Sequence, residues 1–273
     1  GPLEEYNMDR MKTLWRVAAA TTALALVPVF ADHHESAAAE AETAVSFNVQ
    51  AQLCTLHPGK TMAQYDKMVQ GYFNWAKKHD VEVLFVRQTP LFTHANATTE
   101  PEHEFAEFLI SNYETSGDAW DKWLSTEDGQ KLNATWQELA SCHVKMGALY
   151  MQWADQAALD TDDNRIVTWD WCTRKEGVSS DQLKAKHDSI VAAYPEGLAN
   201  IAWAVFVPQI GGANAPGDFA NIVAYPDVKS LMARQKWLNE DEGWRAMRDY
   251  YTSYASCSGP SASVEQVLNR PGQ

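Results

Sequence analysis

An internal repeat is the feature that most constrains how this chain folds. Five short segments recur in the same order in its two halves: Cys54-Thr55 with Cys172-Thr173, Phe85-Val86 with Phe206-Val207, Phe105-Ala106 with Phe219-Ala220, Lys122-Trp123-Leu124 with Lys236-Trp237-Leu238, and Ala140-Ser141-Cys142 with Ala255-Ser256-Cys257. The offset between partners stays between 114 and 121 residues, so only loops change length. We therefore predict two copies of one folding unit, over residues 44–160 and 161–273.

The hydrophobic periods change in the same order within each copy. The first copy is expected to hold strands at 45–56, 81–88, 104–111 and 146–153, with helices at 62–76 and 117–142. The second is expected to hold strands at 166–173, 200–209, 219–225 and 264–268, with helices at 183–194 and 227–257. This order is βαββαβ twice, the unit of ferredoxin-like folds, so the predicted fold class is α+β.

The four cysteines support this topology. In a βαββαβ unit the first strand and the second helix end at the same edge of the sheet, and Cys54 and Cys142 fall at those two ends. Cys172 and Cys257 hold the same positions in the second copy. We predict the disulfides Cys54–Cys142 and Cys172–Cys257, one in each repeat, formed in an oxidising compartment.

The N-terminal region is expected to be a leader and a tether. Residues 1–10 open with Gly-Pro before Met11 and are typical of a cloning remnant, whereas residues 11–31 combine a basic start with an apolar run, as in a secretory signal peptide. A membrane anchor is the alternative, but the run is shorter than the roughly 20 residues that span a bilayer. Residues 32–43 predict a flexible acidic linker. The expected location is periplasmic or secreted, with no membrane span after cleavage.

Charge restricts the partners. The chain has 22 Lys and Arg against 36 Asp and Glu, a formal net charge of −14. Such a surface repels polyanions, so nucleic acid is not an expected partner. An acidic composition also fits life in salty water, in which case the charge carries no information about partners.

The chain resembles the dimeric α/β-barrel superfamily in having two βαββαβ units of this size. In the first unit the long second helix is interrupted at Ser125-Thr126-Glu127-Asp128-Gly129, which adds to the resemblance. That superfamily includes antibiotic-biosynthesis monooxygenases and NIPSNAP-type and EthD-type proteins. The resemblance implies that two sheets meet face to face with the helices outside. The tandem repeat then implies that one chain builds the whole barrel. Such folds host cofactor-free oxygenases, haem enzymes and proteins without known activity, so the resemblance does not select a reaction.

Two histidines are the candidate catalytic groups. His94 and His103 lie in LFTHANATTEPEHEF, a segment longer than its counterpart in the second copy. A histidine at a strand end can act as a base or a ligand, with Glu102 or Glu104 orienting it. The alternative is a solvated polar loop.

The expected mature N-terminus offers a metal site. If cleavage follows Ala31, the chain starts Asp32-His33-His34. A free amine, two backbone amides and an imidazole at the third residue can bind Cu(II) or Ni(II) in a square plane. The site depends on that cut, and no other cofactor is indicated.

Tryptophans and polar strand residues define a candidate ligand site. Tryptophans such as Trp75, Trp120 and Trp203 exceed what a core of this size requires, so some can line a cavity for an apolar ligand, although core packing is the alternative. Trp123 and Trp237 recur in register and are expected to be packing residues. Asn48, Gln50 and Gln52 alternate with apolar residues, and Arg87 lies on the next strand. We expect these groups to face the barrel interior or the junction of the sheets, as a hydrogen-bonded network or as a binding pocket.

The leading interpretation is a protein that binds a small, largely apolar ligand in a cavity lined by tryptophans. A cofactor-independent or metal-assisted oxygenase using His94 and His103 is the second interpretation. A structural or assembly subunit is the third. The sequence does not define the ligand, the reaction or the oligomeric state.

Overall fold

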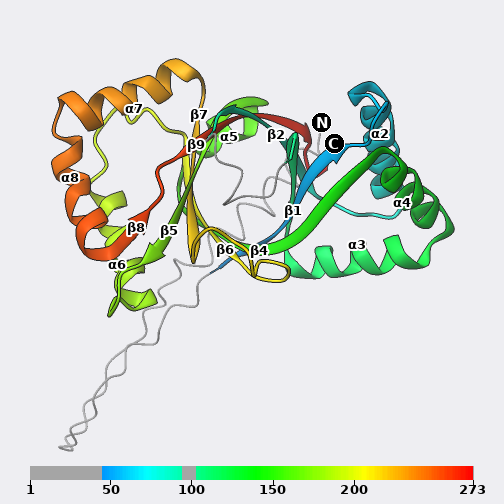
Figure 1. Cartoon of the computed structure of the whole chain (residues 1–273), viewed down its shortest axis with the longest axis horizontal. Coiled ribbons are helices and arrows are strands. Elements are labelled where there is room, and N and C mark those ends of the chain that lie inside the picture. The colour runs from blue at the N-terminus through cyan, green and yellow to red at the C-terminus, as the bar shows by residue number, and fades with distance from the viewer. Residues whose placement is uncertain (1–44, 94–102, 273) are drawn as a thin grey trace, which may run out of the picture. The chain divides into compact units, whose positions relative to one another are not determined.

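Eight strands close into an antiparallel barrel in the computed structural model, which describes residues 45–93 and 103–272 (Figure 1). The neighbours around the barrel run β7-β6-β4-β1-β3-β2-β9-β5, and β5 pairs back with β7. The barrel strands are β1 (Phe47–Leu56), β2 (Leu84–Phe92), β3 (Phe105–Ser111), β4 (Ala140–Ala154), β5 (Asn164–Arg174), β6 (Ala202–Pro208), β7 (Phe219–Tyr225) and β9 (Ser261–Asn269). A short strand, β8 (Ala255–Cys257), extends the pairing of β5. The expected α+β barrel within one chain is confirmed.

Helices flank the barrel on two opposite sides in Figure 1. One side carries α2 (Met62–Lys78), α3 (Tyr113–Ser125) and α4 (Glu127–Leu139), and the other carries α6 (Ser180–Ala192), α7 (Val228–Glu240), α8 (Gly243–Asp249) and the π-helical turn η1 (Tyr250–Tyr254). A short helix that the sequence did not predict, α5 (Gln156–Thr161), follows β4. Local sequence sets several boundaries: Thr61 with Gln64 and Ser179 with Gln182 form capping boxes at the starts of α2 and α6. No helix of the described residues is long and apolar enough to span a bilayer.

The two faces of β1 separate the interior from the helix layer. Val49 and Ala51 belong to a cluster contributed by all eight barrel strands, which fills the interior with Phe108 and Phe206 among its members. Asn48 and Gln50 point the other way, because they contact side chains of α3. The expectation that these polar residues face the barrel interior or the sheet junction is therefore wrong. The apolar residues of the strand fill the closed barrel, and its polar residues find partners on the covering helix.

Both disulfides join the expected cysteines, Cys54 with Cys142 and Cys172 with Cys257. Their positions in the elements differ from the prediction, because α4 ends at Leu139 and Cys142 lies on β4. In each bridge the two cysteines are direct cross-strand partners, with Cα atoms 4.1 Å and 4.0 Å apart. The helical pattern was extended too far because Ala140 and Cys142 continue its apolar spacing.

One of the five repeated segments is not equivalent in space. Phe85 packs in the helix layer, whereas Phe206 lies in the barrel interior. By strand register, the residue of β6 that corresponds to Arg87 of β2 is Val205. Arg87 lies opposite Glu107 on β3, and Val205 lies opposite Asn221 on β7. Glu107 and Asn221 in turn hold the same register relative to Cys54 and Cys172. The match of Phe85-Val86 with Phe206-Val207 is therefore wrong, because it ignored which face each residue occupies.

Candidate functional site

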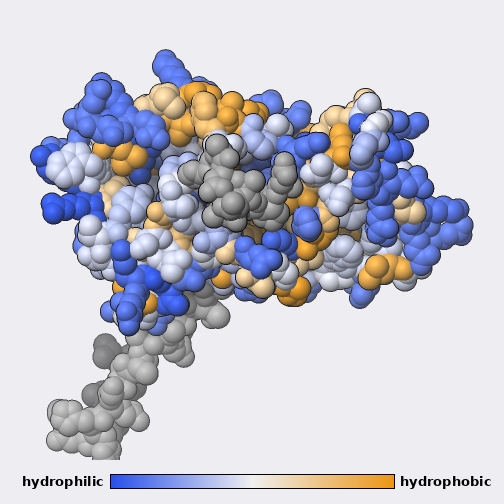
Figure 2. Space-filling model, in the orientation of Figure 1, coloured by the Kyte–Doolittle hydropathy of each residue, from blue (hydrophilic) through white to orange (hydrophobic). Residues whose placement is uncertain are grey.

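A cavity of about 70 Å³ lies between the outer face of β1, β2 and β3 and the helices α2, α3 and α4. We call it the tryptophan cavity. Its aromatic lining is Tyr65, Tyr72, Phe85, Trp75, Trp120, Trp123 and Trp136. Hydrophilic residues dominate the two ends of the molecule in Figure 2, where Figure 1 places the helices. The aromatic residues line the cavity together with residues of β1, β2 and β3, on the sheet side of their helices.

A second hollow of about 320 Å³ lies between α3, α4 and β4, and we call it the outer groove. It shares Trp120, Trp123 and Trp136 with the tryptophan cavity. These three tryptophan residues therefore line both hollows. A volume of a few hundred Å³ is typical of sites for small organic ligands.

A buried ionic network lies at the sheet side of the tryptophan cavity. Glu107, only 1% exposed, accepts a hydrogen bond from the Tyr65 hydroxyl at 2.6 Å and another from Arg87 Nε at 3.0 Å. Arg87 Nη1 reaches Asp66 at 2.7 Å, and Asp66 is half exposed. Arg87 Nη2 lies 3.0 Å from Glu107 Oε2 but makes no hydrogen bond. The network connects the cavity to the protein surface.

Burial and charge shift the acidities of this network in definable directions. Burial raises the pKa of Glu107, and the Arg87 guanidinium opposes that rise. Burial by itself lowers the pKa of Arg87, but Glu107 and Asp66 outweigh it and leave that pKa raised. Burial and the neighbouring Glu107 carboxyl both raise the pKa of Tyr65, so Tyr65 stays a neutral phenol at ordinary pH.

The four indole N–H groups around the tryptophan cavity differ in their partners. Trp120 donates to Gln50 Oε1 at 2.7 Å, Trp136 to the Tyr65 hydroxyl at 3.2 Å, and Trp75 to Thr126 Oγ1 at 3.4 Å. Trp123 Nε1 is buried and has no hydrogen-bond partner in the described chain. Trp123, expected to be a packing residue, is therefore the one donor of this set that the protein leaves unused.

The candidate ligand residues from the sequence divide between the two halves. Trp75 and Trp120 line the tryptophan cavity, and Arg87 reaches it through Glu107. Asn48 does not line it but donates to Ser116, which does. Trp203 lies in the second half, beside His187.

The candidate catalytic and metal residues are not brought to this cavity by the described part of the chain. His103 directly precedes the residues that lead into β3, and it is absent from the lining of the tryptophan cavity and of the outer groove. His94, Asp32, His33 and His34 lie outside the described residues. Their proposed roles stay predictions.

Sequence reasoning missed Tyr65 and Glu107. A usable signal existed for Glu107, because it interrupts the apolar run FAEFLIS of β3, where an acid is expensive unless paired. Tyr65 carries no such signal, since a tyrosine at a helical core position is common.

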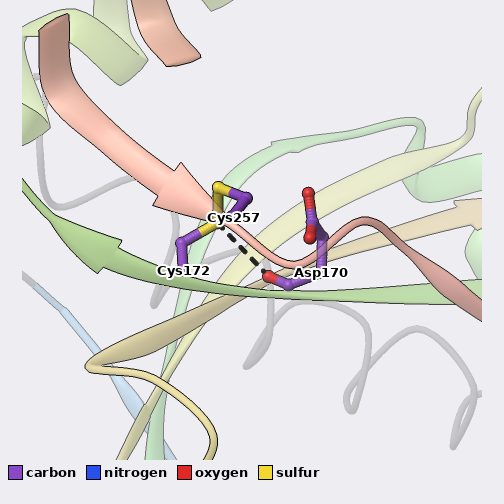
Figure 3. A group of neighbouring side chains, drawn as sticks. All are labelled: Asp170, Cys172 and Cys257. Carbon is purple, nitrogen blue, oxygen red and sulfur yellow. Dashed lines mark hydrogen bonds between the residues drawn. A yellow bond between two sulfur atoms is a disulfide. The ribbon is translucent and has the colours of Figure 1, made fainter. Parts of the chain in front are cut away.

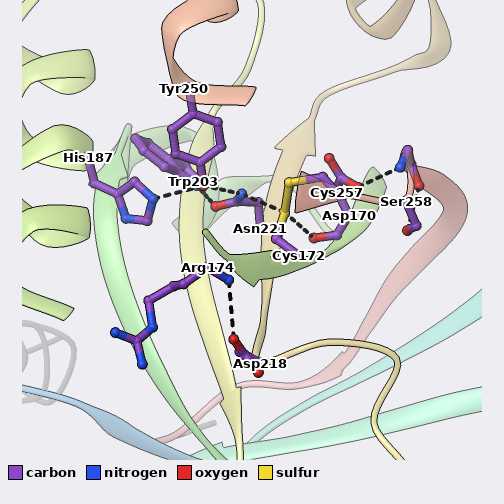
Figure 4. The surroundings of a disulfide bond; sticks show 11 residues. Asp170, Cys172, Arg174, His187, Trp203, Asp218, Asn221, Tyr250, Cys257 and Ser258 are labelled. Atoms are coloured by element: carbon purple, nitrogen blue, oxygen red, sulfur yellow. Dashed lines mark hydrogen bonds between the residues drawn. A yellow bond between two sulfur atoms is a disulfide. The ribbon is translucent and has the colours of Figure 1, made fainter. Parts of the chain in front are cut away.

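In the second half a neutral hydrogen-bonded network lies between the sheet and the helices (Figure 4). His187 Nε2 and the Tyr250 hydroxyl lie 3.0 Å apart, Asn221 Nδ2 donates to the same hydroxyl, and Trp203 Nε1 donates to Asn221 Oδ1. Burial lowers the pKa of His187 to about 4, so the ring is neutral at pH 7. Asn221 lies opposite Asp170, two residues before Cys172, as Glu107 lies opposite Gln52, two residues before Cys54.

Three potential metal ligands meet beside the second disulfide (Figure 3). Ligand atoms of Asp170, Cys172 and Cys257 lie within 4.8 Å of one another. Both sulfurs are bonded to each other, and the Asp170 carboxylate accepts the Gly259 N–H. A disulfide lacks the thiolates that bind metal, so this group is structural.

A buried polar cluster also lies inside the barrel. Glu265 accepts from Gln88 Nε2 at 2.7 Å and pairs with Arg165 at 2.7 Å, and Trp169 donates to Gln88 Oε1. All three polar residues are less than 9% exposed. The cluster spans β2, β9 and β5 and joins strands from the two halves of the chain.

Comparison with known proteins describes an architecture. No protein-family model and no curated protein matches the chain. One similar solved structure is a candidate monooxygenase from Fusobacterium nucleatum, with 10% identity over 84% of this chain and 94% of that chain and a TM-score of 0.48. An anthrone oxidase-like protein has 12% identity over 83% of this chain and 93% of that chain, with a TM-score of 0.48. Chlorite dismutase from Candidatus Nitrospira defluvii has 7% identity over 81% of this chain and 92% of that chain, with a TM-score of 0.45. Similarity at this level does not transfer an activity.

Haem, which some barrels of this type bind, does not fit the tryptophan cavity. No histidine and no free thiol is among its lining residues, and its volume is about 70 Å³. In the second half, the buried His187 is already hydrogen-bonded to Tyr250 and packed against Trp203, with ring centroids 4.9 Å apart.

Proposed function

We propose that this chain binds a small, largely apolar molecule in the tryptophan cavity. The observation that carries the proposal is the lining of this cavity: seven aromatic side chains and one buried carboxylate surround free space between the sheet and the helices of the first half. Apolar walls with a few buried polar groups are typical of small-molecule sites.

The geometry favours binding over catalysis. An oxygenase without a cofactor needs a proton acceptor beside its substrate. The carboxylate that lines the cavity belongs to Glu107, and each of its oxygens already accepts a hydrogen bond. The Tyr65 hydroxyl donates to Glu107 and accepts from Trp136. These hydrogen bonds hold the carboxylate and the phenol in place, which favours a structural role for both groups.

We further propose that the chain is an internal duplication. The neighbour orders β4-β1-β3-β2 and β9-β5-β7-β6 are the same for the two halves. Gly129 packs so closely on Trp123 that a Cβ would lie 2.6 Å from the Trp123 carbonyl oxygen, and Gly243 lies in the same relation to Trp237 at 2.7 Å. A shared backbone contact at matched positions supports common descent of the halves.

The proposed compartment is periplasmic or extracellular. All cysteines of the described residues are paired in two disulfides. Disulfides form and persist in oxidising compartments, which supports this location. The predicted signal peptide over residues 11–31 supports the same compartment.

Calorimetric titration with benzene tests the proposed binding. The wild-type chain is expected to bind one equivalent. Ala119→Leu, which fills the cavity from α3, is expected to weaken binding at least about tenfold, because it removes the volume that the probe occupies. Ala134→Leu is the matched control, since Ala134 is exposed on α4 and lines neither space. Absence of binding, or equal weakening by both variants, would refute the proposal.

A further inference from the structure

The side chain of Gln52 indicates which chemical group the ligand carries. Gln52 lines the tryptophan cavity and is 7% exposed. Its amide makes no hydrogen bond to any residue of the described chain and, unlike Trp123 Nε1, its polar atoms remain accessible. Buried polar groups in proteins are usually satisfied. Resting on the proposed function, we infer that the ligand carries a neutral amide group, which pairs with the amide of Gln52.

The position of Gln52 on β1 directs its amide into the cavity. Ala51 and Leu53 pack in the barrel interior, so the side chain of Gln52 extends from the opposite face of the strand, toward the helices. Its neighbours across β3 and β4 are Glu107 and Val144. The tryptophan cavity lies on this face of β1, and the amide is the far end of the side chain. The accessible polar atoms of Gln52 therefore face the cavity.

Gln50, two residues earlier on the same face, supplies a second donor. An indole N–H donates and does not accept, so the bond from Trp120 Nε1 at 2.7 Å identifies its partner as Gln50 Oε1 and fixes the orientation of that amide. The NH₂ group of Gln50 makes no hydrogen bond within the described residues and remains accessible. Residues two apart on a strand are roughly 6.6 Å apart, which lets both amides reach one ligand group.

A cis amide, as in a lactam ring, suits these two side chains. Its carbonyl oxygen accepts from Gln52 Nε2 while its N–H donates to Gln52 Oε1, which gives two parallel hydrogen bonds. The second lone pair of the carbonyl oxygen then accepts from Gln50 Nε2. A ketone or an aldehyde lacks the N–H and would leave the Gln52 oxygen unpaired.

The ionic network favours a neutral ligand over a charged one. The Arg87 guanidinium pairs with the buried Glu107 carboxylate, so these two buried groups carry no net charge together. Asp66, the other partner of Arg87, is half exposed. A ligand carboxylate or ammonium would lose its hydration in the cavity without gaining a counter-charge, which is unfavourable.

The cavity volume limits the size of the group that binds there. One water needs about 10–15 Å³ of such space, so a cavity of about 70 Å³ holds the equivalent of roughly five to seven heavy atoms. A five-membered lactam ring with its carbonyl oxygen has six heavy atoms and matches that size.

Three probes of six heavy atoms each test the inference. The probe 2-pyrrolidone carries the lactam amide, methylenecyclopentane carries no polar atom, and cyclopentylammonium carries a charge. Each is titrated into ¹⁵N-labelled protein while the side-chain amide resonances of the glutamines are followed. We expect 2-pyrrolidone to shift the amide protons of Gln52 and Gln50 downfield, and methylenecyclopentane to bind without such a shift. Cyclopentylammonium is expected not to bind.

Variants locate the effect. Gln52→Met removes the amide and keeps an unbranched side chain of similar length. It is expected to weaken 2-pyrrolidone about tenfold, because two hydrogen bonds are lost, while retaining methylenecyclopentane within about threefold. Gln70→Met is the matched control and should change neither affinity, since Gln70 is exposed on α2 and lines neither hollow. If Gln52→Met fails to fold, the resonance shifts in the wild-type protein decide alone.

The outcomes separate the two proposals. The amide inference is overturned if 2-pyrrolidone does not bind, if cyclopentylammonium binds more tightly than 2-pyrrolidone, or if Gln52→Met changes the affinities for 2-pyrrolidone and methylenecyclopentane by the same factor. Binding of methylenecyclopentane or benzene leaves the binding function standing in each of these cases. Failure of 2-pyrrolidone, methylenecyclopentane and benzene together overturns the binding function itself.

Discussion

Gly147 on β4 lies directly beneath the ring of Phe206 on β6, so close that a Cβ at residue 147 would overlap the ring. Phe206 is one of the interior side chains, and its ring meets the edge or face of Trp169 and Trp171. The missing side chain of Gly147 therefore makes room for the aromatic packing that fills the barrel where β4 and β6 join.

The first prediction concerns this contact. Gly147→Ala is expected to destabilise the fold by about 1–3 kcal/mol, because the interior has no room for the methyl group. Adding Phe206→Leu should recover part of that loss, giving a non-additive double-mutant cycle. The measurement is urea unfolding. Gly117→Ala is the control, since nothing lies within 4 Å of its added Cβ. It should stabilise α3 by about 0.5–1 kcal/mol, and equal losses in both variants would contradict the overlap.

The second prediction concerns the buried ion pair. Glu107→Gln leaves the Arg87 guanidinium buried beside a neutral amide, and is expected to cost about 3–5 kcal/mol of unfolding free energy. Combining it with Arg87→Met should cost less than Glu107→Gln alone, because the unpaired charge is removed. Glu82→Gln, at an exposed position, should stay within about 0.5 kcal/mol of the wild type. A double variant less stable than the single one would show that the charge is not the cause.

The third prediction concerns pH. Burial lowers the pKa of His187 to about 4 from an ordinary 6.5, so the unfolded chain binds this proton more readily than the folded chain. The stability contributed by the neutral ring is complete above about pH 6.5 and is lost as the pH falls toward 4. Between pH 7 and pH 5 the loss should be about 2 kcal/mol.

Unfolding at a series of pH values measures this contribution. His187→Gln should flatten the dependence between pH 5 and pH 7, whereas His143→Gln, at an exposed position, should leave it unchanged. An unaltered slope in His187→Gln would assign the dependence to other groups.

The fourth prediction concerns the disulfides. Their sequence separations are 88 and 85 residues, so the chain-entropy model gives nearly equal stabilisation, at most about 4–5 kcal/mol for each. Replacing Cys54 and Cys142 with alanine, or Cys172 and Cys257, should lower the unfolding free energy by similar amounts. Thermal and urea unfolding of the two double variants provide the comparison. A loss confined to one pair would mean that local packing, not loop closure, determines the effect.

Element order could be predicted from this sequence because it depends on local periodicity and on repeated segments. The cysteine pairing followed from topology and was right even though Cys142 was placed on a helix. Which face of a strand lies inside the barrel could not be read from alternation, since both faces of β1 are covered. Asn48 and Gln50 show this: polar residues beneath a helix look the same in sequence as polar residues in an interior.

The candidate site was predictable only in part. Trp75 and Trp120 stood out by residue type, but the feature that distinguishes Trp123 is a missing hydrogen-bond partner, which exists only in three dimensions. The network of Tyr65, Glu107 and Arg87 joins a helix to two strands, and no sequence spacing announces it.

Closing the barrel within one chain has a consequence for its evolution. Two identical subunits around a twofold axis would have to present every cavity twice, and every mutation would change both copies. In a single chain that arose by the proposed duplication the two halves can change separately, and Glu107 and Asn221, which hold the same register relative to Cys54 and Cys172, differ in charge. On the proposed function, the first half is thus free to keep the tryptophan cavity while the second carries the hydrogen-bonded network of His187, Tyr250 and Asn221.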